Sequence, residues 1–212
     1  MTDTPGGSRE IEIKLELTED VYGRIRREAG GRELRSETQQ NTFFDTEDLR
    51  LKREGWALRL RREAGRHVMT LKGLPAGRVG GVFDREEHEA EVPPEKAEAL
   101  YGGFSVADVG LPPARKLREL FGAIRLRERF RFVNRRTYIP FGNWVLELDK
   151  TEIAHRSFYE LEMEVSAADA ERAAAELRRW FGENGWVYRP STLSKLLKAE
   201  RVFADGASLP LG

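Results

Sequence analysis

Charged and apolar residues alternate with a period of two at the start of the chain. Residues 10–14 read EIEIK, so an extended strand places Glu10, Glu12 and Lys14 on one face and two isoleucines on the other. A solvated sheet face explains any one such strand, but it explains six of them poorly. The same alternation recurs in segments that contain Arg59/Arg61, Arg85/Glu87/Glu89, Arg131/Arg135, Glu147/Asp149 and Glu160/Glu162/Glu164.

Turn residues and helix caps separate these segments and predict the remaining elements. Strands are expected at residues 10–14, 35–45, 49–52, 56–62, 66–72, 83–92, 125–139, 144–153 and 158–165. Helices are expected at residues 18–28, 95–100, 113–121, 167–183 and 192–202. About eight strands with short antiparallel links favour an α+β protein, built as a closed antiparallel barrel with helices packed outside. Its interior would be charged, which is unusual.

The length of 212 residues suits one domain with a substantial core. We place this domain at residues 9–203, between a disordered start (1–8) and a loose tail (204–212). A glycine-rich stretch at residues 73–81 lacks a phosphate-loop pattern and predicts a mobile loop at the mouth of the barrel.

The composition excludes several classes of protein. The chain has 36 basic and 36 acidic residues, so bulk charge does not favour nucleic acid. It has no cysteine, which removes disulfides, thiolate nucleophiles and thiolate metal sites. The first residues lack an apolar signal segment, and no stretch approaches 18 apolar residues, so we expect a cytoplasmic protein without membrane contact.

A charged barrel interior limits the chemistry inside it. Buried charges are tolerated when they pair, bind metal or line a wet cavity. Arginine and lysine suit phosphoryl oxygens, whereas carboxylates suit Mg²⁺ or Mn²⁺, which prefer oxygen ligands. An interior with both signs therefore indicates an anionic substrate that binds together with a divalent metal ion.

At this level of detail the sequence resembles CYTH domains, also called triphosphate tunnel metalloenzymes. The resemblance spans about residues 9–200, and the leading EIEIK alone is a weak pattern. The ordered elements are EIEIK, NTFFDT, ALRLR, TLKG, the Arg-x-Glu-x-Glu of residues 85–89, Arg135 with Tyr138, the Glu-x-Asp of residues 147–149, FYELE and Ser194-Lys195. The resemblance implies an eight-stranded antiparallel tunnel, a small triphosphate-containing substrate and dependence on Mg²⁺ or Mn²⁺.

Carried over by position, the resemblance also implies roles for individual residues. Those binding triphosphate would be Lys14, Arg59, Arg61, Lys72, Arg85, Arg135 and Lys195. The metal ligands would be Glu10, Glu12, Glu160 and Glu162, with Glu147 and Asp149 near them. Catalytic roles would fall to Glu10, Glu12, Glu87 and Glu162, with Glu89 beside them as a positioner of water or metal.

One position departs from the family pattern. The basic residue often found two positions before the matched Arg135 is Val133 in this chain. Arg131 or Arg136 could take its place.

The reaction implied is phosphoryl transfer to water, most simply the hydrolysis of tripolyphosphate to pyrophosphate and phosphate. Adenylyl cyclase and thiamine triphosphatase activities are alternatives within the same fold. A non-catalytic polyphosphate or nucleotide binder is the alternative outside enzymes, but the intact acidic strands favour catalysis. Neutral net charge and interleaved acids count against binding of nucleic acid. The protein could be a monomer or a homodimer.

Overall fold

The computed structural model describes residues 8–73, 77–79 and 82–204. The predictions for the two chain ends lie almost wholly outside these residues, and so does much of the loop expected at residues 73–81. Within the described part of that loop, residues Gly77–Val79 form the short strand β5. None of the described helices is long and apolar enough to cross a membrane.

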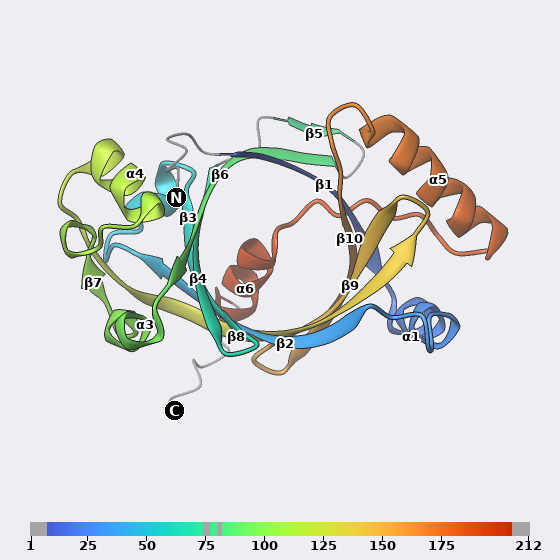
Figure 1. Ribbon diagram of the computed structural model, residues 1–212, viewed down its shortest axis with the longest axis horizontal. Coiled ribbons are helices and arrows are strands. Elements are labelled where there is room, and N and C mark those ends of the chain that lie inside the picture. Colours follow the sequence, from blue (N-terminus) through green and yellow to red (C-terminus); the bar gives the residue numbers. More distant parts are fainter. Residues whose placement is uncertain (1–7, 74–76, 80–81, 205–212) are drawn as a thin grey trace.

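Eight antiparallel strands close into a barrel, as the sequence predicts (Figure 1). In order around the barrel these are β1 (Ser8–Leu17), β10 (Arg156–Glu164), β9 (Trp144–Ile153), β8 (Arg125–Phe141), β2 (Arg35–Asp45), β3 (Ala57–Glu63), β4 (Arg66–Lys72) and β6 (Val82–Val92). The ring is completed by pairing between β1 and β6, in which Glu10 lies opposite Arg85. Strand β5 pairs with β6, and the short β7 (Phe104–Ser105) pairs with β8.

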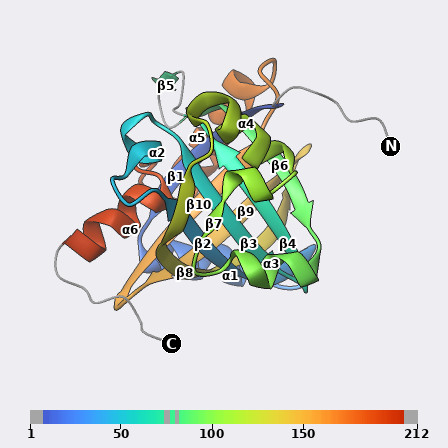
Figure 2. The same ribbon diagram turned by 90° about the vertical axis from the view of Figure 1, so that its left-hand side faces the viewer.

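The helices fall into two outer groups and one inner helix (Figure 1). Their bounds are α1 (Glu19–Glu28), α2 (Arg50–Arg53), α3 (Pro94–Leu100), the 3₁₀ helix η1 (Val106–Asp108), α4 (Pro112–Phe121), α5 (Ala170–Glu183) and α6 (Lys195–Ala204). Helices α1 and α5 lie on one side of the barrel, and α3 and α4 lie on the opposite side. Helix α6 lies inside the ring in Figure 1 and toward one end of the barrel in Figure 2.

The apolar faces of the strands point outward, beneath the outer helices. Leu15 and Leu161 pack in one cluster with Phe181 of α5. Leu60 and Met69 pack in a second cluster with Leu117 of α4. Burying a side chain of this size contributes about 1.5–3 kcal/mol. Because the helices cover the outside, the charged faces of the same strands are left for the interior.

Helix α6 has a different apolar partner, the interior wall itself. Its Ala199 and Val202 are buried against Phe43, Phe132 and Ile153. These three residues lie on strands β2, β8 and β9, so the far end of the barrel interior is apolar. The sequence predicted helices packed outside the barrel, so the inner position of α6 differs from that prediction.

The strand predicted at residues 49–52 is wrong, because this segment is the helix α2. The carboxylate of Asp45 accepts backbone N–H groups of Leu51 (2.9 Å) and Lys52 (3.1 Å). These bonds satisfy donors at the start of the helix, which have no partner within it. The buried Leu51 then packs against the outer cluster of β3 and β4. Helix α2 has only four residues, too few to show a helical or strand periodicity, so the side-chain cap determined its conformation.

Candidate active site

A cavity of about 510 Å³ lies inside the barrel. Most of the residues predicted for the site line it: Glu10, Glu12, Lys14, Arg59, Arg61, Lys72, Arg85, Glu87, Glu89, Glu147, Glu162 and Lys195. Asp149 and Glu160 lie behind this surface and are fully buried. Antiparallel pairing brings these positions together, since Glu160 lies opposite Asp149, and Glu162 opposite Glu147.

One side of the interior, which we call the carboxylate wall, consists of Glu12, Glu147, Asp149, Glu160 and Glu162 on β1, β9 and β10. Three cations that line the cavity pair with this wall, and a fourth, the buried Lys198, pairs with Glu160. Lys14 of β1 lies 3.0 Å from Glu12 and 2.7 Å from Glu162. Arg136 of β8 donates two hydrogen bonds to Asp149, at 2.8 and 2.6 Å, and one to Glu162 at 2.6 Å.

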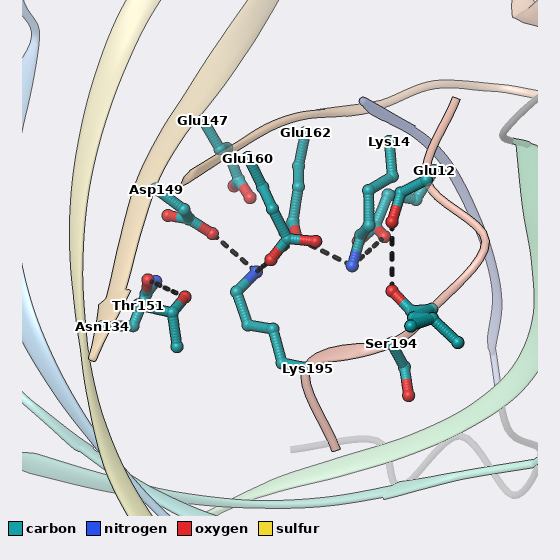
Figure 3. Close-up of polar contacts among 12 residues, drawn as sticks. Glu12, Lys14, Asn134, Glu147, Asp149, Thr151, Glu160, Glu162, Ser194 and Lys195 are labelled. Carbon is teal, nitrogen blue, oxygen red and sulfur yellow. Dashed lines mark hydrogen bonds and ion pairs between the residues drawn. The ribbon is translucent and has the colours of Figure 1, made fainter. Parts of the chain in front are cut away.

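The third cation is Lys195, the first residue of α6 (Figure 3). Its ammonium lies 2.7 Å from Asp149 and 3.5 Å from Glu160, and it also forms an ion pair with Glu162. The side chain is 14% exposed, so these contacts are largely shielded from water. A residue from a separate helix thereby completes the charge balance of a wall built by strands.

The pKa values on this wall follow from burial and from the paired cations. Burial favours the neutral form of Glu162, but Lys14, Lys195 and Arg136 outweigh it and hold the pKa of that carboxyl well below its usual range. Burial raises the pKa of Glu147 to about 7, although Arg136 opposes the shift. Glu147 is thus the carboxyl of this wall that can exchange a proton near neutral pH.

The opposite side, which we call the cation wall, consists of Arg59, Arg61, Lys72 and Arg85 on β3, β4 and β6. Lys72 lies 2.7 Å and Arg85 2.9 Å from the same oxygen of Glu10. These two cations overcome the effect of burial and lower the pKa of Glu10. Burial raises the pKa of the neighbouring Glu87 to about 7. Glu87 also lies 3.2 Å from Lys72, so this part of the wall is internally paired.

Arg59 differs from these cations. Its guanidinium donates to the Thr70 hydroxyl at 3.2 Å, and its buried Nε has no hydrogen-bond partner. Within the described part of the chain Arg59 forms no ion pair, and burial together with repulsion from Arg61 lowers its pKa to about 9. Arg61 donates only long hydrogen bonds, to Asn41 at 3.3 Å and Glu63 at 3.5 Å. A buried guanidinium without an anion is costly, so this end of the wall suits an anionic ligand.

The structure corrects one predicted cradle position, Arg135. Its side chain is 54% exposed on the outside of the barrel, where it pairs with Glu152. The residue that points inward is Arg136, one of the two replacements considered for the departure at Val133. The other, Arg131, pairs with Glu128 at 2.8 Å and does not line the cavity. Strand β8 has polar residues on both faces, so alternation alone does not fix which face is inside.

Sequence reasoning missed a buried uncharged network and a second lysine of α6. Thr151 donates to Asn134 at 2.8 Å, and Asn134 donates to Gln39 at 3.1 Å. Lys198 is buried and lies 2.8 Å from Glu160. Two spacings could have identified these residues. Gln39 lies two residues before Asn41 and so on the same face of the strand, and Lys198 lies three residues after Lys195 and so on the same face of the helix.

The carboxylate wall fits a divalent cation in its chemistry. Its donors are hard oxygens of the kind that Mg²⁺ and Mn²⁺ prefer, and the buried Glu160 Oε2 accepts no hydrogen bond from the described residues. Among the described residues, however, no group of three or more acidic or histidine side chains has the arrangement of a ready metal site. The protein's own ammonium and guanidinium groups stand between the carboxylates instead.

Comparisons with known proteins agree with this geometry. The family model described as the CYTH domain matches residues 8–185, a range that ends before α6. The putative adenylyl cyclase HpAC1 from Hippeastrum, whose dominant activity is described as triphosphatase, is 28% identical with a TM-score of 0.78, over 95% of this chain and 98% of that chain. No curated protein matches the sequence.

Two more distant solved structures share the fold. A putative adenylate cyclase from Bacillus halodurans is 21% identical with a TM-score of 0.70, over 91% of this chain and 98% of that chain. The PH1819 protein from Pyrococcus horikoshii is 20% identical with a TM-score of 0.62, over 91% and 99%. With a family match over most of its length and a charged tunnel at its centre, the chain belongs to the CYTH family, whose members act on triphosphate-containing molecules.

Proposed function

We propose that this protein is a Mg²⁺- or Mn²⁺-dependent hydrolase of a triphosphate, most simply inorganic tripolyphosphate. The observation that carries the proposal is the half-buried Arg59, which has no ion pair among the described residues yet lines a cavity shared with buried carboxylates. The volume of about 510 Å³ is that of an ordinary small-molecule site.

In this proposal the two walls have different tasks. Arg59, Arg61, Lys72 and Arg85 bind the non-bridging phosphate oxygens by charge-assisted hydrogen bonds. Because charge spreads over these oxygens in the transition state, preplaced guanidinium groups stabilise it without reorganising.

The carboxylates would hold the divalent cation. The ligands would come from Glu10, Glu12, Glu160 and Glu162, with Glu147 and Asp149 beside them. A bound Mg²⁺ or Mn²⁺ would offset phosphate charge and lower the pKa of a coordinated water.

Glu87 provides a group that can accept a proton during the reaction. Its pKa of about 7 leaves a large ionised fraction at neutral pH. The carboxylate lies 3.2 Å from the Lys72 ammonium, within the wall that would bind phosphate. We assign Glu87 as the general base that receives a proton from the attacking water at Oε1 or Oε2.

The test is to incubate the purified protein with tripolyphosphate, ATP or thiamine triphosphate, each with Mg²⁺, Mn²⁺ or EDTA, and to identify the products. Metal-dependent release of phosphate from tripolyphosphate supports the proposal. Cyclic AMP and pyrophosphate from ATP would replace the hydrolase with a cyclase. Tight binding of tripolyphosphate without turnover of any substrate would instead indicate a binding module.

The adenylyl cyclase is the second candidate. It is favoured by the naming of HpAC1 as a putative adenylyl cyclase, but the dominant activity described for that protein is triphosphatase. That description supports hydrolysis as the first choice in our proposal.

A further inference from the structure

We propose that Lys195 is a tethered counter-ion, which occupies the carboxylate wall when no metal is bound and is displaced when a divalent cation binds there. The inference rests on the proposed metal-dependent function. It assigns to Lys195 a role in metal affinity that is separate from phosphate binding. It also explains why carboxylates of suitable chemistry do not form a ready metal site among the described residues.

The contacts of the Lys195 ammonium are those of a small cation among oxygen ligands. It reaches carboxylates of two neighbouring strands, Asp149 of β9 and Glu160 and Glu162 of β10. Figure 3 shows the side chain extending from the start of α6 into this group. The contact with Glu160 Oε2 is long, at 3.5 Å, and that oxygen accepts no hydrogen bond. The Lys195 ammonium thus leaves this oxygen of Glu160 poorly satisfied.

The other two cavity-lining cations of the wall are fixed more firmly. Lys14 and Arg136 belong to strands β1 and β8, whose backbones are held in the barrel by pairing on both sides. Of the three cations that line the cavity, Lys195 is the one that comes from helix α6 and not from a strand. Its ammonium is a compact charge on a flexible four-carbon stem, so it can leave by rotation of the side chain alone. Since Lys195 also lines the cavity, it has space in which to turn.

Helix α6 is held by other contacts during this exchange. Lys198 lies 2.8 Å from Glu160, and Glu200 lies 3.0 Å from Lys52 of α2. Val202 and Ala199 remain packed against the apolar end of the barrel. The exchange therefore requires movement of one side chain and no displacement of the helix.

The exchange links metal binding to substrate binding. An ammonium released from the carboxylates stays within the cavity, where it can pair with a phosphate oxygen. Each ligand then makes the other bind more tightly, and the coupling is reciprocal by thermodynamic linkage. In the absence of triphosphate, Lys195 lowers the affinity of the wall for a divalent cation.

The first test measures Mn²⁺ binding by isothermal titration calorimetry, without substrate, for the full chain and for Lys195→Met. Removal of a competing charge should raise the Mn²⁺ association constant of Lys195→Met at least about tenfold, since a neighbouring charge shifts the affinity of a carboxylate for a cation by one to three powers of ten. The matched control is Arg201→Met, an exposed cation of the same helix, which should bind Mn²⁺ like the original chain. Equal or weaker Mn²⁺ binding by folded Lys195→Met overturns the proposal.

A second test uses the unaltered protein and so does not depend on the folding of a variant. Acetic anhydride modifies accessible lysine amines, and mass spectrometry reports the extent at each position. Mn²⁺ should increase acetylation of Lys195 several-fold and leave that of the buried Lys198 unchanged. No change at Lys195 in the presence of saturating Mn²⁺ overturns the proposal. If Mn²⁺ exposes Lys195 but no triphosphate is hydrolysed, the counter-ion role stands and the hydrolase assignment fails.

Discussion

The two walls of the barrel interior differ in how their charges are compensated. On the carboxylate wall, Glu162 contacts three cations, and Arg136 contacts three carboxylates. On the cation wall, Arg59 donates a hydrogen bond to the Thr70 hydroxyl and forms no ion pair with any described residue. Both walls belong to one barrel and face one cavity. The difference indicates that the carboxylate wall is held together by its own contacts, whereas the Arg59 end of the cation wall has no paired anion among the described residues and suits one supplied by a ligand.

The largest expected effect comes from breaking the carboxylate wall at Arg136. The change Arg136→Met leaves Asp149, Glu147 and Glu162 buried with one cation fewer. Removal of one partner from a buried ion pair typically costs about 3–5 kcal/mol. The free energy of unfolding, measured by urea denaturation, should fall by that amount. A loss below about 1 kcal/mol would show that the wall does not depend on this guanidinium.

The next effect concerns turnover rather than folding. Glu162→Gln removes a buried carboxylate expected to hold the metal, so metal-dependent hydrolysis should fall at least about a hundredfold. The control is Glu171→Gln, an exposed carboxylate of α5 that does not line the cavity. Phosphate release is measured for both variants with Mg²⁺ and Mn²⁺. Activity of Glu162→Gln equal to that of the control would contradict the assignment.

On the cation wall the same kind of substitution should have a different outcome. Arg59→Met removes a half-buried charge that has no ion pair among the described residues, and keeps an apolar stem of similar length. We therefore expect no loss of thermal stability in the absence of ligand. Affinity for tripolyphosphate should fall roughly 10–100-fold, as for loss of a hydrogen bond to a charged group.

Isothermal titration calorimetry with tripolyphosphate provides the measurement for Arg59→Met. Arg135→Met, on the outside of the barrel, is the control and should bind like the original chain. If Arg59→Met destabilised the free protein as much as Arg136→Met does, the contrast between the walls would be lost.

The smallest effect should come from outside both walls. The Thr18 hydroxyl accepts the N–H of Val21 at 3.2 Å and caps α1. Thr18→Ala should lower the free energy of unfolding by about 1 kcal/mol without altering affinity for tripolyphosphate. A change in that affinity would mean that the outer helices affect the interior.

Local sequence patterns were sufficient to predict an element where one local interaction or one clear alternation determined it. Thr18 and the acidic residues after it predicted the start of α1, and the alternation of residues 66–72 predicted β4 with its observed bounds. They were insufficient where a contact with a residue outside the segment determined its conformation. Residues 49–52 form a helix because Asp45 satisfies its first N–H groups, and that contact depends on a turn that the sequence pattern does not specify.

The candidate site shows the same division. The inward positions of β1 and β3 were predictable, because the charged residues of segments 10–14 and 59–61 alternate with isoleucine or leucine. Strand β8 reads RLRERFRFVNRRTYIPF, with charges on both faces, and its register shifts near Phe43 and Phe44 of β2. Arg135 was therefore placed inside and Arg136 only considered as a substitute, whereas pairing with β9 puts Arg136 beside Asp149.

The sequence by itself determined that this protein has charged strand faces of both signs, and its period-two alternation determined which residues share a face. It also determined the antiparallel barrel, because short links join strands whose apolar faces need a cover. Only the tertiary structure decided which cations meet which carboxylates, that α6 enters the barrel, and that Lys195 pairs with three acids while Arg59 pairs with none of the described ones. These outcomes depend on register and on contacts between residues far apart in the chain, which the local spacing of residues does not encode.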